Sequence, residues 1–162
     1  MNGRFDLQTS IARLASTASR LDLLIVGLTE SQLRSRPDPE AFSIKENVLH
    51  LRDIEMQGYG PRLRRILTEK NPLLPDVDGT RLATERRYNE QPMAPAVEEF
   101  RQAREECVGM LRRVTAQHLT RTAQMEKVGS ITLAQLIGRW CDHDEEHLAA
   151  VEKLCSELRG KA

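Results

Sequence analysis

The chain has 162 residues, a length that suits a single domain built around one hydrophobic core. It carries 24 acidic and 24 basic residues, so no net charge attracts nucleic acid or an anionic membrane surface. One tryptophan, two tyrosines and three phenylalanines are too few to favour recognition of nucleic acid by base stacking. We therefore expect one domain, residues 1–162, that acts on a small molecule.

The cysteines and the apolar runs indicate where the protein works. There are three cysteines, an odd number, and no CxxC spacing connects Cys107, Cys141 and Cys155. This usage fits a reducing compartment better than a disulfide framework. The first residues lack the apolar core of a signal peptide, and no apolar run approaches membrane length. We expect a cytoplasmic protein without a membrane partner.

The first half of the chain predicts two helices. Residues 5–28 carry apolar side chains at alternating steps of four and three, typical of a bundle helix: Leu7, Ile11, Leu14, Ala18, Leu21, Ile25 and Leu28. Two prolines in 29–41 should end this helix. Ser43 and Glu46 then have the spacing of a capping box, which predicts a second helix over 44–69. We expect Pro61 to kink or loosen the turn before it.

The second half predicts a long connection and two more helices. Residues 71–92 hold three prolines and no periodic pattern, apart from a short helix expected around 81–88. A third helix is predicted over 95–117, and a capping box at Thr132 and Gln135 opens a fourth over 132–158. No segment predicts a strand. The expected fold is all-α: a four-helix bundle with a long connection between helices 2 and 3.

Three of the four histidines form a candidate metal site. His143 and His147 are one turn apart on the fourth helix, so both imidazoles project from the same side. His50 lies about two turns inside the second helix and supplies a third nitrogen if the two helices face each other. Three histidines would leave coordination positions open for water or substrate, as catalytic sites do. His118 is expected near the end of the third helix, in solvent and away from the others.

Other interpretations of these residues remain. The pair His143 and His147 could belong to an exposed polar face, and His50 could be a hydrogen-bonded core residue. The segment 143–147 also resembles the zincin HExxH motif, but Asp144 replaces the glutamate base and only fifteen residues follow. A ferritin-like di-iron site would need Glu-x-x-His on two helices, which the chain lacks.

Several of these segments together resemble the DinB-like superfamily. Residues 42–51, read as Phe-Ser-Ile-Lys-Glu-Asn-Val-Leu-His-Leu, resemble its "W-S-x-x-E-x-x-x-H-L" opening of helix 2. Residues 129–133 followed by 143–148 resemble its "G-x-x-T-L … H-D-x-x-H-L" ending. The resemblance extends through 78–80 and 100–104 and so covers most of the chain. Phe42 stands where tryptophan is usual.

The resemblance implies a four-helix bundle of variant topology, commonly a homodimer. It also implies a divalent metal, zinc, nickel or iron, held by His50, His143 and His147. The best understood relatives are thiol-dependent transferases and isomerases that use a low-molecular-weight thiol as co-substrate. The function expected from the resemblance is therefore a metal-dependent enzyme, with a thiol-dependent S-transferase favoured.

The site chemistry leaves two alternatives to the transferase. One is a metal-dependent hydrolase, and the other is a metal-binding stress or interaction protein without catalysis. The sequence assigns no catalytic residue beyond the metal ligands. Asp144 is next to one ligand and Asp53 is one turn from another, so both are candidates to orient imidazole N–H groups. A solvated surface carboxylate is the simpler interpretation for each.

Overall fold

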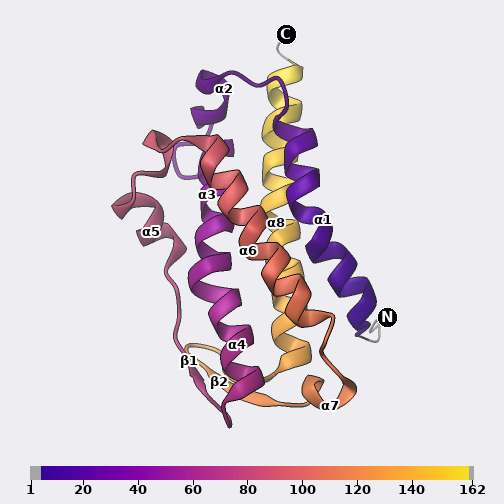
Figure 1. The fold of residues 1–162 in the computed structure, drawn as a ribbon. Coiled ribbons are helices and arrows are strands. Elements are labelled where there is room, and N and C mark those ends of the chain that lie inside the picture. The colour runs from indigo at the N-terminus through magenta and orange to yellow at the C-terminus, as the bar shows by residue number, and fades with distance from the viewer. Residues whose placement is uncertain (1–4, 161–162) are drawn as a thin grey trace.

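Four long helical segments run along a common axis in the computed structural model, which describes residues 5–160 (Figure 1). They are α1 (Leu7–Ile25), α3 continued by α4 (Ile44–Ile54 and Gly60–Thr68), α6 (Met93–Leu111) and α8 (Leu133–Arg159). The segments α1 and α8 run in one direction, and α3–α4 and α6 run in the opposite direction (Figure 1). The predicted four-helix bundle is confirmed, with α1 packed on α8 and α6, and α3 packed on the same two helices.

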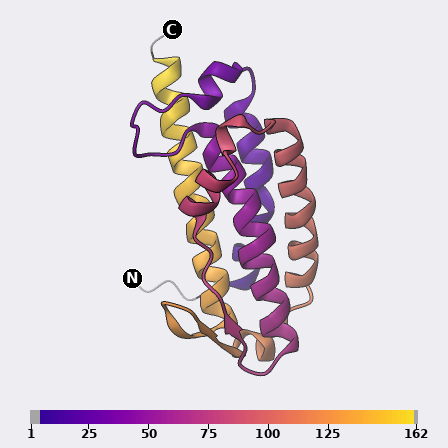
Figure 2. The ribbon, with the colours of Figure 1, turned by 90° about the vertical axis from the view of Figure 1, so that its left-hand side faces the viewer.

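A long crossover connects α4 to α6. Because these two segments are parallel, the chain must return along the whole bundle between them. It does so through β1 (Leu73–Leu74), α5 (Gly79–Glu85) and a 3-10 turn, Tyr88–Glu90, along one side of the molecule (Figure 2). The predicted long connection and its short helix are confirmed, although the helix begins and ends earlier than the expected 81–88, at Gly79 and Glu85.

Both predicted capping boxes form. The Ser43 hydroxyl accepts from the Glu46 amide at 3.1 Å, and the Glu46 carboxylate accepts from the Ser43 amide at 2.8 Å. Thr132 and Gln135 make the same pair of bonds at 3.2 and 2.8 Å. Each box satisfies two of the amides that a helix start leaves without a partner. A further box at Thr29 opens α2 (Glu30–Arg34), which was not predicted.

A π-helical turn, Glu55–Tyr59, separates α3 from α4 within one continuous helical segment. Pro61 has no N–H to donate to the preceding turn, so the helix widens there, as the predicted loosening requires. The Gly60 amide donates to the Glu55 carbonyl instead. The extra residue in this turn leaves both Glu55 and Tyr59 buried in the bundle interior.

The expectation of no strands was wrong. A small three-stranded sheet closes one end of the bundle, with β1 parallel to β2 (Thr122–Met125) and β2 antiparallel to β3 (Gly129–Thr132). The strands are too short to show an alternating pattern in sequence. They form because Ala123, Met125 and Ile131 cover the end of the apolar core.

The third long helix ends earlier than predicted. We expected 95–117, but α6 ends at Leu111, and a separate one-turn helix, α7 (Ala116–Leu119), follows. The Nδ1 atom of His118 accepts from the Thr115 amide at 3.0 Å, so His118 closes a capping box at the start of α7. His118, expected near the end of the third helix, therefore lies in a separate short helix and helps to cap its start.

Two large clusters of buried apolar side chains fill the bundle, and a third, smaller cluster joins α3 and α6 to the crossover. One lies toward the sheet and includes Leu14, Leu63, Ile66, Leu136 and Trp140. The other lies toward the opposite end and includes Leu21, Val48, Leu51, Phe100, Leu148 and Val151. None of the described helices combines the length and apolarity needed to cross a membrane.

Four buried polar residues lie between the two clusters. We call this set the polar layer: Thr17, Glu55, Arg104 and Asp144. Along α8, Asp144 lies between Trp140 of one cluster and Leu148 of the other. The candidate metal ligands lie at the same level, where α3 packs on α8.

Candidate metal centre

Three imidazole rings meet where α3 faces α8. His50 comes from α3, and His143 and His147 come from successive turns of α8. Their ring centroids are 4.4 to 5.1 Å apart, and one nitrogen from each ring lies within 4.8 Å of the others. The Nε2 atoms of His50 and His143 are 3.0 Å apart. The structure thus brings together the three histidines selected from the sequence, and His118 lies apart on α7.

Burial keeps two of these rings, His50 and His147, uncharged. His50 is 8% exposed, and burial lowers its pKa to about 3, with the two neighbouring imidazoles adding to the effect. Burial likewise lowers the pKa of His147 to about 4, helped by His143. Metal ligation requires neutral imidazole, so these two rings are in the binding form at neutral pH.

The arrangement fits a divalent transition metal. Two nitrogens bound at about 2.1 Å, at roughly right angles, would be about 3 Å apart, as the Nε2 atoms of His50 and His143 are. The buried Nδ1 atoms of the same two rings have no hydrogen-bond partner among the described residues. An all-imidazole donor set suits zinc, nickel or iron, whereas magnesium and calcium prefer oxygen ligands.

Asn47 holds the third ring. Its Oδ1 lies 2.7 Å from Nδ1 of His147, and its side chain is buried. Asn47 precedes His50 by three residues on α3, so both side chains reach α8 from one side of the helix. No local pattern in the sequence indicates a role for Asn47, because only the packing of α3 on α8 shows what it contacts.

Gly79 and Phe42 enclose the rings. A Cβ atom on Gly79 would lie 2.2 Å from Cε1 of His50, so the first turn of α5 can approach the ring only with glycine there. The ring of Phe42 lies 5.5 Å from that of His50 and 6.5 Å from that of His147, centroid to centroid. In the sequence, the segment 78–80 is distinguished only by its resemblance to the family.

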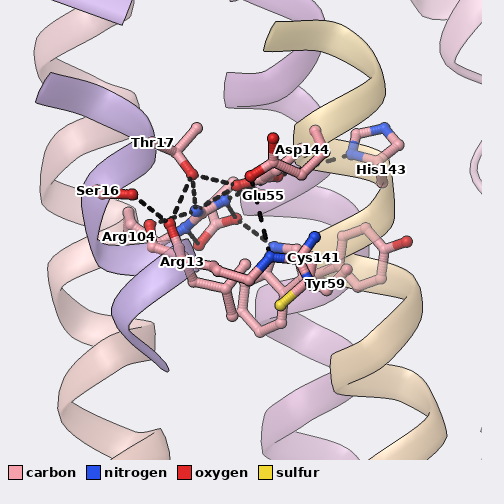
Figure 3. Close-up of polar contacts among 12 residues, drawn as sticks. Arg13, Ser16, Thr17, Glu55, Tyr59, Arg104, Cys141, His143 and Asp144 are labelled. Atoms are coloured by element: carbon pink, nitrogen blue, oxygen red, sulfur yellow. Dashed lines mark hydrogen bonds and ion pairs between the residues drawn. The ribbon is translucent and has the colours of Figure 1, made fainter. Parts of the chain in front are cut away.

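Asp144, which belongs to the polar layer, lies next to His143 and pairs with Arg104 (Figure 3). Arg104 donates to Asp144 at 2.6 Å, and the hydroxyl of Thr17 donates to Asp144 at 2.6 Å. Its Oδ1 is 3.8 Å from Nδ1 of His143, which is too long for a hydrogen bond. Burial acts to raise the pKa of Asp144, but the charge of Arg104 and the hydrogen bonds from Arg104 and Thr17 act together against it, and the pKa lies below its usual value.

Asp53 lies in a different network. Its carboxylate accepts from Arg86 at 2.8 Å, from Tyr88 at 2.6 Å and from Arg52 at 2.8 Å. These bonds tie α3 to the crossover. They engage the carboxylate with cations and a phenol, and none of them is to a histidine ring.

A pocket of about 550 Å³ opens beside His147. Phe42, Asn47 and Leu154 form part of its wall, with Glu146 and Lys153 among its charged residues. Because His147 also lines this pocket, a small molecule bound there would lie beside its imidazole ring.

The fold and this cluster define a helical bundle with a candidate metal centre between two of its long helices. The sequence profile of the DinB superfamily matches residues 13–151. The chain belongs to the DinB superfamily, and the resemblance found in the sequence is confirmed.

Similar proteins from other bacteria are named as candidate metal-dependent hydrolases. A candidate metal-dependent hydrolase of Halalkalibacterium halodurans is 26% identical over 148 residues, 91% of this chain and 85% of that protein. One from Oceanobacillus iheyensis is 26% identical over 131 residues, 81% of this chain and 75% of that protein. The solved structure of YfiT from Bacillus subtilis, described as a probable metal-dependent hydrolase with an unusual four-helix bundle topology, superposes with a TM-score of 0.88. That match has 20% identity and covers 98% of this chain and 90% of YfiT, and it shows the common fold.

Proposed function

We propose that the protein is a metal-dependent enzyme in which His50, His143 and His147 hold one divalent transition metal, zinc, nickel or iron. The observation that carries the proposal is the convergence of three buried or half-buried imidazoles, two of them with strongly lowered pKa values.

A divalent ion held by three neutral imidazoles keeps its charge and lowers the pKa of a thiol or water bound beside it. The protein supplies the neutral rings, the apolar wall at Phe42 and the pocket beside His147. The carboxylates of Asp53 and Asp144 are engaged by arginines, so neither is free to act as a general base. A thiol substrate needs little help from such a base, because its pKa of about 8.5 is far below that of water and a bound metal ion would lower it further.

The reaction we favour is therefore transfer of a low-molecular-weight thiol to an electrophilic small molecule. Support comes from the open three-histidine arrangement and from the thiol-dependent chemistry that the family resemblance implies. Hydrolysis is the second candidate, and the names of the relatives favour it. A metal-binding stress or interaction protein without catalysis is the third.

Metal content tests the site itself. Protein purified without a histidine tag should contain close to one equivalent of a transition metal, measured by mass spectrometry of the elements. Changing His50, His143 or His147 to alanine should each remove most of it, while His118→Ala, on α7, should leave it unchanged. Equal metal content in all four variants would contradict the proposed ligands.

Two activity screens separate the reactions. The metal-loaded protein is incubated with an electrophile and a panel of small thiols, and separately with ester and amide substrates without thiol. The transferase is supported if the electrophile is consumed only when thiol is present and if the His147→Ala variant no longer consumes it. Thiol-independent cleavage supports the hydrolase, and no turnover in either screen supports the interaction protein.

We further propose a cytoplasmic homodimer. The cytoplasm is supported by the three cysteines, all buried and all free thiols. Dimerisation is supported by the family resemblance and by two exposed apolar side chains: Leu23, near the C-terminal end of α1, is 75% exposed, and Val26, just after that end, is 69% exposed. Light scattering at micromolar concentration should give about twice the chain mass of 18.4 kDa. A monomer mass would contradict this.

A further inference from the structure

Asn47 is the residue beside the candidate metal centre whose role is most sharply defined by its contacts. It is 2% exposed, and its Oδ1 lies 2.7 Å from Nδ1 of His147. No such partner is present for the corresponding nitrogen of His50 or His143 among the described residues.

The orientation of the Asn47 amide follows from its other contacts. Its Nδ2 lies 2.9 Å from the carbonyl of Ser43 and 3.4 Å from that of Phe42. Carbonyl oxygens only accept hydrogen bonds, so the NH₂ group must face them. The side-chain oxygen must then face His147. An amide oxygen also only accepts, and Nδ1 of His147 must therefore carry the hydrogen.

We propose that Asn47 is a positioning residue that fixes His147 as its Nδ1–H tautomer and so leaves the lone pair on Nε2 for the metal ion. The inference rests on the metal centre proposed above. A neutral imidazole has one bare nitrogen, and only that nitrogen can bind a metal. A partner that accepts from the other nitrogen selects the tautomer and also fixes the ring plane.

The anchoring of Asn47 makes this selection rigid. Its two carbonyl acceptors belong to the residues that immediately precede α3, where the Ser43 capping box fixes the backbone. The amide group is thus held from the helix start while its oxygen reaches across to α8. The same stretch of chain carries Phe42, which stacks on the ring of His147.

Two substitutions separate the oxygen's role from the packing role of the side chain. N47D keeps an acceptor facing His147 and loses the NH₂ bonds to the two carbonyls. N47L has similar size and loses both. The affinity for Zn²⁺ is measured by competition with a chelating dye, and thermal stability is measured on the same samples.

We expect N47L to bind Zn²⁺ about 10- to 100-fold more weakly than the original protein, the usual effect of losing a residue that orients a ligand. N47D should bind within about threefold of the original, or more tightly, although it should lose stability as N47L does. The matched control is N89L. Asn89 accepts from the Ser43 hydroxyl at 2.6 Å and so touches the same helix cap without touching a histidine. Its substitution should leave Zn²⁺ affinity unchanged.

A measurement on the metal-free protein reads the tautomer directly. Long-range proton–nitrogen NMR spectra of the imidazoles should show Nδ1 of His147 protonated in the original protein and in N47D. A mixture of tautomers is expected in N47L. If N47L does not fold, the spectra of the other two proteins still decide the matter.

The outcomes distinguish the inference from the metal centre itself. A protonated Nε2 on His147, or equal losses of Zn²⁺ affinity in N47D and N47L that follow their losses of stability, would overturn the positioning role. Failure of the original protein to bind any divalent metal would overturn the proposed function, and the tautomer of His147 would still be measurable.

Discussion

Gly79 sets how closely the crossover approaches His50. In G79A the new methyl group would overlap the imidazole, because the Cβ position is 2.2 Å from Cε1. Either the ring or the start of α5 must move, so Zn²⁺ binding should weaken by about tenfold or more, as when a ligand is displaced. The affinity is measured by dye competition.

The control for this substitution is G109A. Gly109 lies inside α6, and a Cβ atom there would meet nothing within 4 Å. It should leave metal binding unchanged and stabilise the helix by about 0.5–1 kcal/mol. Unaltered Zn²⁺ affinity in G79A would contradict this prediction, because it would mean that α5 can move away from His50 without weakening metal binding.

The buried histidines should make the metal-free protein sensitive to mild acid. His50 and His147 have an ordinary pKa of 6.5 that folding lowers to about 3 and about 4. Below pH 6.5 the unfolded chain binds protons that the folded chain does not, so stability falls as the pH falls. The loss approaches about 1.4 kcal/mol per pH unit for each histidine, until the folded-state pKa is reached.

Urea denaturation in the presence of a chelator, at intervals between pH 7 and pH 4.5, measures this dependence. His147→Gln should reduce its slope, because only one deeply shifted histidine then remains. His118→Gln, on α7, is the matched control and should keep the original slope. A slope that is the same in all three proteins would show that the rings are not held neutral by burial.

Sequence spacing was enough to select the three histidines but not the residues that support them. His143 and His147 share a helix face by periodicity, and His50 needed only the assumption that two helices face each other. Asn47 and Gly79 act across an interface between segments, and no local pattern reveals such a contact. Asp53 shows the opposite failure. Its position one turn from His50 suggested a hydrogen bond to that ring, but its carboxylate accepts from Arg86 and Tyr88 instead.

At the scale of helices, the capping boxes should contribute measurably to stability. Ser43→Ala should cost about 1–2 kcal/mol, toward the upper value because the Ser43 hydroxyl also donates to Asn89 at 2.6 Å. Thr132→Ala should cost about 1 kcal/mol. Thr29→Ala, at the exposed start of the five-residue helix α2, should cost about 0.5 kcal/mol. Chemical denaturation gives the three values, and equal effects at all three sites would contradict this order.

Helix starts were predicted better than helix ends and strands. A capping box is a local signal of four residues, and both predicted boxes form where expected. The end of α6 had no such signal, because the apolar spacing continues to Val114 while the chain turns toward α7. The strands depend on Ala123, Met125 and Ile131 covering an end of the core, and this packing exists only in the assembled bundle.

At the scale of the whole molecule, one arginine on α6 connects all four long helical segments of the bundle through hydrogen bonds. Arg104 of α6 donates to Glu55 in the π-helical turn at 2.8 Å and to Asp144 of α8 at 2.6 Å. It also donates to the Leu14 carbonyl of α1 at 2.8 Å. The guanidinium matches this set because it presents several N–H donors in one plane. Burial raises the pKa of Glu55 above its usual value, and Arg104 opposes part of that rise.

Removing this cation should therefore destabilise the protein strongly. Arg104→Met keeps much of the side-chain volume but leaves two buried carboxylates without a counter-charge, at a cost of about 3–5 kcal/mol. Arg101→Met, one turn earlier on α6, is the matched control. Arg101 pairs with Asp22 at 2.8 Å on a much more exposed surface, where an ion pair contributes at most about 1 kcal/mol.

Urea denaturation at pH 7 measures both values, and a second measurement at pH 5 tests the cause. If the loss in Arg104→Met arises from unpaired charge, acid should reduce it, because protonation of Glu55 and Asp144 removes the charge that Arg104 would have balanced. A loss that is equally large at both pH values would instead mean that Arg104 acts by filling space between the two apolar clusters. A loss no larger than that of Arg101→Met would mean that the polar layer contributes little to holding the four helices together.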